Sequence, residues 1–415
     1  MNIRNPGQDG AGKGSAPENT GAGKASPVHM YRVSLLILFF MMGSVFGSWA
    51  SRIPDIKRAL SLSDGALGLA LFAAPTGEFA AVAVAALLIK RWGSQAVILA
   101  GLPCYAVCLT GLGLAPSLPF LAAALFLFGF ASNTFNIALN AQAVDVECLY
   151  KRPIMSTFRG MWSLGGVAGA IVAPLGLPPL PHFIIMCAVT CLVTFSVRHR
   201  ILPHDLPRKF TPKKHRGFTM PSCFILLLGF IAFSNMATEG TMYDWSAVYF
   251  AQVVRPGEAL VRAGYIACMI CMVCCRFIAD RLVVRFGAIR VLQFGGLCTA
   301  AGFLLACLVP TLPAATAGFA MVGFGMAPAI PLCYSLTSKS RTVSPSVAIS
   351  IISTISFFGM LASPAGVGML SHVFGLQTAL MPLAAMGLSI IVLAPLLTRA
   401  ASERITSASS SSSFT

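Results

Sequence analysis

The chain has 415 residues, of which 56% are apolar and only 10% charged, and its mean hydropathy is +0.80. A soluble domain carries about 25% charged residues, so this composition excludes a soluble globular protein and a disordered one and indicates a membrane protein. The net charge of +16 would fit nucleic-acid binding only if the basic residues formed one patch, so their positions decide that question.

Residues 1–28 contain no apolar stretch, which predicts a disordered cytoplasmic tail rather than a signal peptide. From Tyr31 onward, apolar runs of about 20 residues recur, each long enough to cross a hydrocarbon core of about 30 Å. The sequence predicts twelve transmembrane helices, at residues 31–51, 64–89, 95–115, 118–142, 154–176, 180–198, 219–243, 261–283, 288–309, 313–335, 346–370 and 374–398. We therefore expect an all-α integral membrane protein.

Lysine and arginine residues are divided unequally between the two sides of this predicted topology. With the N-terminus inside, 22 of the 29 fall in inside segments, five fall outside, and Arg159 and Arg276 fall within helices. This asymmetry predicts that both termini are cytoplasmic. Because the positive charge is spread over many loops without interleaved stacking aromatics, it also argues against nucleic acid as a partner.

An internal repeat divides the chain into two halves. Shifting the second half by 194 residues aligns 88–93 with 282–287, Gly129 with Gly323, and Gly165 with Gly359. Three matches at one offset, in separate predicted helices, indicate a true repeat. The repeat predicts two pseudo-symmetric six-helix bundles with a binding site between them near mid-membrane.

The domain boundaries follow from the repeat and from the basic segment between its halves. We expect an N-terminal bundle at 29–198, a cytoplasmic linker at 199–218, a C-terminal bundle at 219–399 and a second disordered cytoplasmic tail at 400–415.

The twelve helices, the six-plus-six repeat, the basic central loop and the Arg-aromatic-Gly turn after the second and eighth helices resemble the major facilitator superfamily of secondary transporters. Several strings further resemble its MosC-like or YbjJ-like branch, namely Ser51-Arg52-Ile53-Pro54, Asn140-Ala141-Gln142-Ala143-Val144, Arg152-Pro153-Ile154-Met155-Ser156, Ser163-Leu164-Gly165-Gly166, Asp244-Trp245-Ser246 and Asp280-Arg281-Leu282. The resemblance implies the twelve-helix fold of that superfamily and a monomer. The association of the branch's namesake with rhizopine, an inositol-like compound, gives a weak hint of substrate.

The sequence departs from the superfamily pattern at the loop after the second helix. The usual Asp is replaced by Lys90 in the first half and by Val284 in the second, so the usual gating salt bridge is in doubt. The arginine that many proton antiporters carry in the fourth helix and the Gly-Pro pair of their fifth helix are also absent, which disfavours a drug–proton antiporter.

Charged residues near helix ends are candidates for gating. Arg276 and Asp280 are spaced four apart and are expected to pair, while Arg52 and Asp55 are expected to form a loop ion pair or an outer gate. The full set of predicted gating residues is Arg52, Asp55, Arg91, Asp145, Glu147, Arg152, Arg276, Asp280 and Arg285.

Acidic residues within helices are costly to insert, so each is a functional hypothesis. Glu239 is the first candidate for proton coupling and Glu78 the second, with Asp244 beside Trp245 as a further candidate. A carboxylate in a partly dry cavity is suited to loading and releasing a proton. The alternative is a structural role as the partner of a Ser, a backbone carbonyl or an Arg.

Polar and aromatic residues suggest where a substrate would bind. Asn133, Asn136 and Asn140 place three amides on one helix face, which must meet protein or water rather than lipid. Amides suit hydroxyl-rich solutes, although contacts between helices explain them as well. Arg159 is a candidate for an anionic group, and Trp49, Trp162 and Trp245 for packing on a sugar.

The sequence therefore predicts a secondary transporter of the bacterial inner membrane that moves a small polar, sugar- or cyclitol-like metabolite, with proton symport. The alternatives are a proton-coupled efflux antiporter for amphipathic or cationic compounds and a non-transporting membrane sensor. No nucleotide-binding or hydrolase motif indicates an enzyme or a cofactor. Cys268, Cys271, Cys274 and Cys275 lie in an apolar helix and are assigned to packing rather than to a metal. The expected partners are the solute, protons and lipid.

Overall fold

The computed structural model describes residues 27–150, 154–172, 177–203, 222–337 and 345–411, and these ranges fold into helices without strands. The first half contains α1 (Pro27–Ala59), α2 (Asp64–Gly113), α3 (Leu118–Tyr150), α4 (Met155–Val172), α5 (Pro179–Val197) and the short η1 (Arg198–Arg200). The second half contains α6 (Cys223–Tyr249), η2 (Phe250–Val254), η3 (Glu258–Leu260), α7 (Ala263–Phe286), α8 (Ala288–Leu308), α9 (Leu312–Met326), α10 (Ala329–Leu336), α11 (Pro345–Phe374), α12 (Leu376–Ala379) and α13 (Met381–Ser411).

The helices account for the twelve predicted membrane spans. In the described part of the chain, ten helical segments are long and apolar enough to cross a membrane. The longest, α2, has 50 residues and turns at Gly93, where φ is 79° and ψ is 159°, so it supplies two spans. The 18 residues of α4 rise about 27 Å and supply the remaining one. The predicted all-α membrane fold is confirmed.

The internal repeat has a direct structural counterpart. Gly93 and Gly287, which the offset of 194 residues aligns, both have positive φ, at 79° and 83°, and each turns the chain between two helical runs. A Cβ at Gly129 would overlap the carbonyl oxygen of Ala74, and one at Gly323 would overlap that of Cys268, which lies 194 residues after Ala74. The same close helix contact is therefore built twice.

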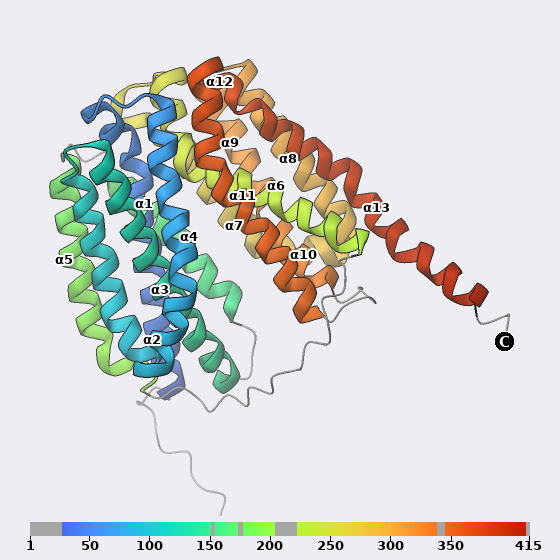
Figure 1. The fold of residues 1–415 in the computed structure, drawn as a ribbon, viewed down its shortest axis with the longest axis horizontal. Coiled ribbons are helices and arrows are strands. Elements are labelled where there is room, and N and C mark those ends of the chain that lie inside the picture. The colour runs from blue at the N-terminus through green and yellow to red at the C-terminus, as the bar shows by residue number, and fades with distance from the viewer. Residues whose placement is uncertain (1–26, 151–153, 173–176, 204–221, 338–344, 412–415) are drawn as a thin grey trace, which may run out of the picture.

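The helices pack as two bundles that lie side by side (Figure 1). In the first, α2 packs against α3 and α5, and α1 against α4. In the second, α6 packs against α11, α8 against α9 and α13, and α7 against α9. The bundles meet through α1 with α6, α2 with α11, and α4 with α7, so these six helices enclose the space between the halves.

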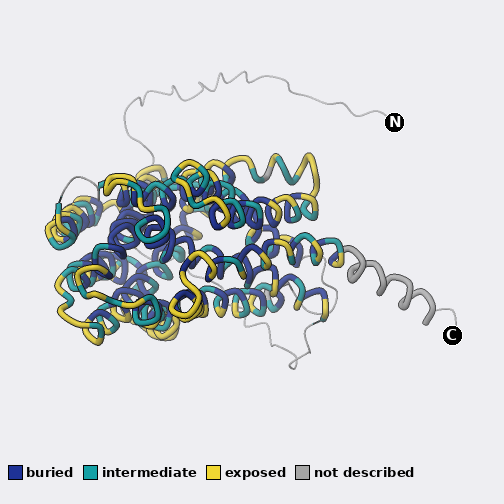
Figure 2. Tube along the Cα trace, turned by 90° about the horizontal axis from the view of Figure 1, so that it is seen from above, coloured by how far each residue is buried: buried dark blue, intermediate teal, exposed yellow. Residues whose placement is uncertain are grey.

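The outer surface of the molecule is apolar. Figure 2 shows the buried stretches concentrated between the helices, with exposed turns facing outward. Many of these exposed positions carry large hydrophobic side chains, among them Leu127, Leu192, Phe277 and Val392. A monomeric soluble protein rarely exposes so much contiguous apolar surface, which fits a surface in contact with lipid.

The end of the chain extends the last helix. α13 continues as helix to Ser411, so residues 400–411, which the sequence predicted as part of a disordered tail, are helical, and they extend beyond the second bundle (Figure 1). Most of the predicted linker 199–218 lies outside the described residues.

Candidate functional site

A cavity of about 220 Å³ lies between the two bundles. Its walls come from α1, α2, α3 and α4 of the first half and from α6, α7 and α11 of the second. Its polar lining consists of Glu78, Tyr105, Ser132, Asn133, Asn136, Asn140, Arg159, Trp162, Glu239, Tyr243 and Arg276. Phe39, Met42, Phe46, Met236 and Met360 complete the lining. Eight residues predicted for proton coupling, substrate binding or gating therefore meet in one place.

The three asparagines form a linked stripe along α3. The Asn140 side-chain amide donates to the backbone and side-chain oxygens of Asn136, at 2.8 and 2.7 Å. Asn136 donates to the side-chain oxygen of Asn133 at 3.5 Å, and Asn133 donates to the backbone carbonyl of Glu78 at 2.7 Å. This last bond ties the stripe to α2. The amides thus face the cavity in fixed orientations.

Glu239 and Arg276 form an ion pair within the second bundle. The Arg276 Nη2 lies 3.5 Å from Glu239 Oε1, and the Tyr243 hydroxyl donates to the same carboxylate oxygen at 2.5 Å. Arg276 Nη1 also donates to the Ser163 hydroxyl on α4, at 2.7 Å. Arg276 therefore connects a carboxylate of its own bundle to the opposite bundle.

Glu78 and Asp244 face each other's bundle from α2 and α6. Both line a side cavity of about 30 Å³, with Trp49, Ser132 and Tyr243 among its other walls. Among the described side chains, neither carboxylate has a hydrogen bond or an ion pair. A cavity of this volume holds about one water molecule. Two acidic groups from opposite halves thus share a small space without a cation in contact.

Arg159 and the three tryptophans differ in their access to the cavity. Arg159 and Trp162 line it from α4, and Arg159 forms no ion pair within the described residues. Trp49 lines only the side cavity. Trp245 is completely buried in the core and lines neither cavity, so its predicted contact with substrate has no geometric support in this conformation.

One end of the interface between the bundles is closed by charged groups. Arg52 Nη1 lies 3.0 Å from Asp55 Oδ2, as the spacing predicted, and Arg262 from the second half lies 2.8 Å from the same oxygen. Arg262 also donates to the Ser51 backbone carbonyl at 3.0 Å. Arg52 further donates to His182 at 3.3 Å, so this ion pair is anchored in both bundles.

Asp64 makes a second polar connection at the same end. This first residue of α2 pairs with Lys57 of the first half and accepts hydrogen bonds from Ser371 of α11 and from Gln252 of η2, the last at 3.1 Å. Asp64, Arg262 and Ser371 were not among the residues singled out from the sequence. Their signal was a polar residue at the first or last turn of an apolar run, which the sequence offers at many positions.

The other predicted gating residues lie apart from this end. Glu147 accepts hydrogen bonds from the backbone N–H groups of Ile154 and Met155, at 2.7 and 2.9 Å, and so caps the start of α4. Asp145 is buried on α3. The guanidinium groups of Arg91 and Arg285 lie over the rings of Trp92 and Phe286. Arg152 and the side chain of Asp280 lie outside the described residues, so the predicted pairing of Arg276 with Asp280 stays a prediction.

Within the described residues, no group of three or more His, Cys, Asp and Glu side chains is arranged to hold a metal ion. Cys268 and Cys275 are buried in the core.

The sequence of this membrane protein matches a known family. The family model described as Major Facilitator Superfamily matches residues 34–344. The chain belongs to the major facilitator superfamily. The resemblance predicted from its motifs is therefore confirmed, and the molecule is a multi-pass membrane transporter.

Curated relatives cover most of this major facilitator. An uncharacterised MFS-type transporter of Yersinia pestis is 31% identical over 84% of the chain and 91% of the relative. The uncharacterised transporter y4wD of Sinorhizobium fredii is 32% identical over 86% and 96%. The membrane protein MosC of Rhizobium meliloti is 26% identical over 84% and 86%.

Solved structures share the fold of this major facilitator. The nucleoside transporter NupG superposes with a TM-score of 0.69 over 89% of the chain and 99% of NupG. A bacterial homologue of the lysosomal transporter Spinster, in an inward-facing and occupied conformation, superposes with a TM-score of 0.70 over 91% and 98%. Both are 15% identical to this chain, so they establish the fold alone.

Proposed function

We propose that this transporter carries a small polar, sugar- or cyclitol-like solute by proton symport. The observation that carries the proposal is the amide-rich cavity between the bundles. Asparagine amides both donate and accept hydrogen bonds, which matches vicinal hydroxyl groups, and Trp162 offers a ring face beside them. The cavity volume of about 220 Å³ is below the about 300–1,000 Å³ typical of sites for drug-sized ligands. This size favours a small metabolite over an amphipathic drug.

Proton coupling is assigned to the three carboxylates between the bundles. Protonation of Glu239 removes the charge that holds Arg276, which leaves Arg276 bound to Ser163 of the opposite bundle. Glu78 and Asp244 are suited to carry a proton because they face one another across the bundle interface without a cation in contact. A change of protonation at these positions therefore changes the attraction between the two halves.

Alternating access is supported by the unequal ends of the interface. The contacts of Arg262 and Asp64 close one end, while the bundles diverge toward the opposite end (Figure 1). The Lys and Arg asymmetry of the loops assigns the divergent end, with both chain termini, to the cytoplasm. We propose that the transporter acts as a monomer in the inner membrane, and that this conformation faces inward.

The test uses purified protein in liposomes that contain a pH-sensitive dye. Cyclitols, sugars, small acids and cationic drugs are added outside, and the internal pH and solute uptake are followed. Acidification that requires a sugar or cyclitol and the folded protein supports symport of that solute. Proton movement opposite to the solute, in response to cationic drugs alone, would replace the proposal with an efflux antiporter. Binding of a cyclitol without any flux would replace it with a sensor.

A further inference from the structure

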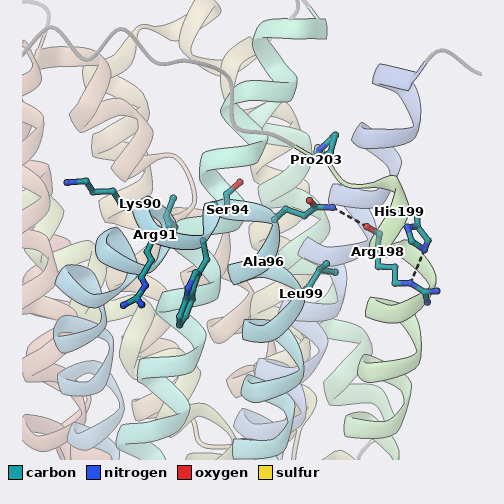
Figure 3. Close-up of a pocket in the computed structure, with 12 residues that line it drawn as sticks. Lys90, Arg91, Ser94, Ala96, Leu99, Arg198, His199 and Pro203 are labelled. Carbon is teal, nitrogen blue, oxygen red and sulfur yellow. Dashed lines mark hydrogen bonds between the residues drawn. The ribbon is translucent and has the colours of Figure 1, made fainter.

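A basic pocket of about 650 Å³ lies at the periphery of the first bundle, away from the central cavity (Figure 3). One wall is the turn of α2 around Gly93, and the other is the end of α5 with η1. The Gln95 side chain donates to the Arg198 backbone carbonyl at 3.4 Å and connects the two walls. The transport function described above makes no use of this pocket.

The pocket concentrates positive charge. Lys90 and Arg91 lie on one side, and Arg198 and His199 on the other (Figure 3), while none of its lining residues is acidic. Lys90, Arg91 and Arg198 form no ion pair within the described residues. Arg198 Nε instead donates to the His199 ring at 3.0 Å. The cations are therefore available for an anion that the protein itself does not supply.

The position of the pocket identifies the kind of anion. One helical turn from it, Leu87 on α2 and Phe195 on α5 are 66% and 63% exposed, on the surface that contacts lipid tails. Trp92, which lines the pocket, is 60% exposed, as is typical of tryptophans at a membrane interface. The pocket thus lies where the apolar surface ends and a basic surface begins. A phospholipid matches both parts, whereas a free phosphate ion uses only the basic part.

The second half of the chain provides an internal comparison. Gly287 repeats the turn of Gly93, but Val284 stands where the first half has Lys90. The pocket beside the second turn is almost entirely apolar and contains a single cation, Arg290. The basic pocket is therefore a property of the first half and not a general consequence of the repeated turn.

We propose that this pocket binds the phosphate headgroup of an anionic phospholipid from the leaflet at that end of the bundle. Basic pockets between transmembrane helices bind such headgroups. Lys90, Arg91 and Arg198 contact the phosphate oxygens, and the acyl chains lie along the surface around Leu87 and Phe195. The proposal does not depend on the identity of the transported solute.

The experiment is native mass spectrometry of the full chain, purified and mixed with phosphatidylglycerol or with zwitterionic phosphatidylethanolamine. The wild type is expected to retain phosphatidylglycerol preferentially. K90A/R91A/R198A is expected to weaken that binding about 100-fold, since each interfacial cation contributes about five-fold. The matched control R285A/R290A removes two cations from the repeat-related turn and is expected to retain the lipid.

Two results would overturn the proposal. The first is equal retention of phosphatidylglycerol by the wild type and by K90A/R91A/R198A, provided that both proteins elute as folded monodisperse species. The second is displacement of the lipid by inorganic phosphate as efficiently as by phosphatidylglycerol, which would make the pocket a site for free phosphate. Lipid binding that needs both the cations and the acyl chains supports it.

Discussion

Arg276 Nη2 lies 3.5 Å from Glu239 Oε1, and Nη1 of the same guanidinium donates to Ser163 across the bundle interface. One side chain therefore joins a carboxylate on α6 to a hydroxyl on α4. Loss of the negative charge on Glu239 leaves Arg276 with the contact to the opposite bundle. The pair couples the charge state of the cavity to the contact between the halves.

The first prediction concerns Glu239→Gln. The amide keeps the size of the side chain but cannot carry a proton, so solute accumulation driven by a pH gradient is expected to fall to background. Exchange of labelled for unlabelled solute, which needs no net proton movement, is expected to remain. Both are measured in the same liposomes, and unchanged accumulation would remove Glu239 from the coupling mechanism.

Glu78→Gln and Asp244→Asn are the companions to that variant. Because both carboxylates lie between the bundles without a cation in contact, each substitution is expected to reduce coupled accumulation while exchange persists. If only Glu239→Gln uncouples transport, the proton site is the Arg276 pair alone. If only the other two uncouple it, Glu239 serves to position Arg276.

The second prediction concerns the closed end of the interface. Arg262→Ala removes the ion pair with Asp55 and the hydrogen bond to the Ser51 carbonyl, so this end is expected to open more often. Hydrogen–deuterium exchange of residues 51–64 is expected to rise, while exchange in α8 stays unchanged. Arg255→Ala is the control, because Arg255 is at the same end but bonds only to the Gln252 carbonyl of its own half. Equal exchange in both variants would contradict a gating role for Arg262.

The third prediction concerns the amide stripe. Asn136→Leu keeps the approximate volume but removes a group that accepts from Asn140 and donates to Asn133. Solute affinity is expected to fall about 10-fold or more, since an unpaired buried polar group costs about 1–3 kcal/mol. Binding is measured by tryptophan fluorescence or calorimetry in detergent. Thr110→Val, on an exposed turn of α2, is the control and is expected to bind like the wild type.

Much of the fold follows from the sequence alone. Hydropathy predicts the spans because a helix must be apolar over about 30 Å to cross lipid, and the offset of 194 residues predicts the turns at Gly93 and Gly287. The helical extension to Ser411 was not predicted, because a run of Ser, Ala and Thr without an apolar stripe resembles a solvated tail.

The partners of charged residues were harder to predict. Spacing of four residues suggested Asp280 for Arg276, yet Glu239 on a different helix lies beside it. Contacts between helices depend on how the bundles are rotated against each other, and residue spacing within one helix contains no information about that rotation. For the same reason Trp245, adjacent to Asp244 in the chain, points into the core while Asp244 faces the side cavity.

The last prediction tests the repeated close contact between helices. A Cβ at Gly129 would overlap the carbonyl oxygen of Ala74, so Gly129→Ala is expected to separate α2 from α3 and to destabilise the protein by about 1–3 kcal/mol. Gly111→Ala is the matched control, because nothing lies within 4 Å of its added methyl group and alanine favours the helix by up to about 1 kcal/mol. The melting temperature in detergent is expected to fall for the first variant and to stay or rise for the second. A fall for both would mean that helix flexibility, rather than close packing, accounts for the glycine at position 129.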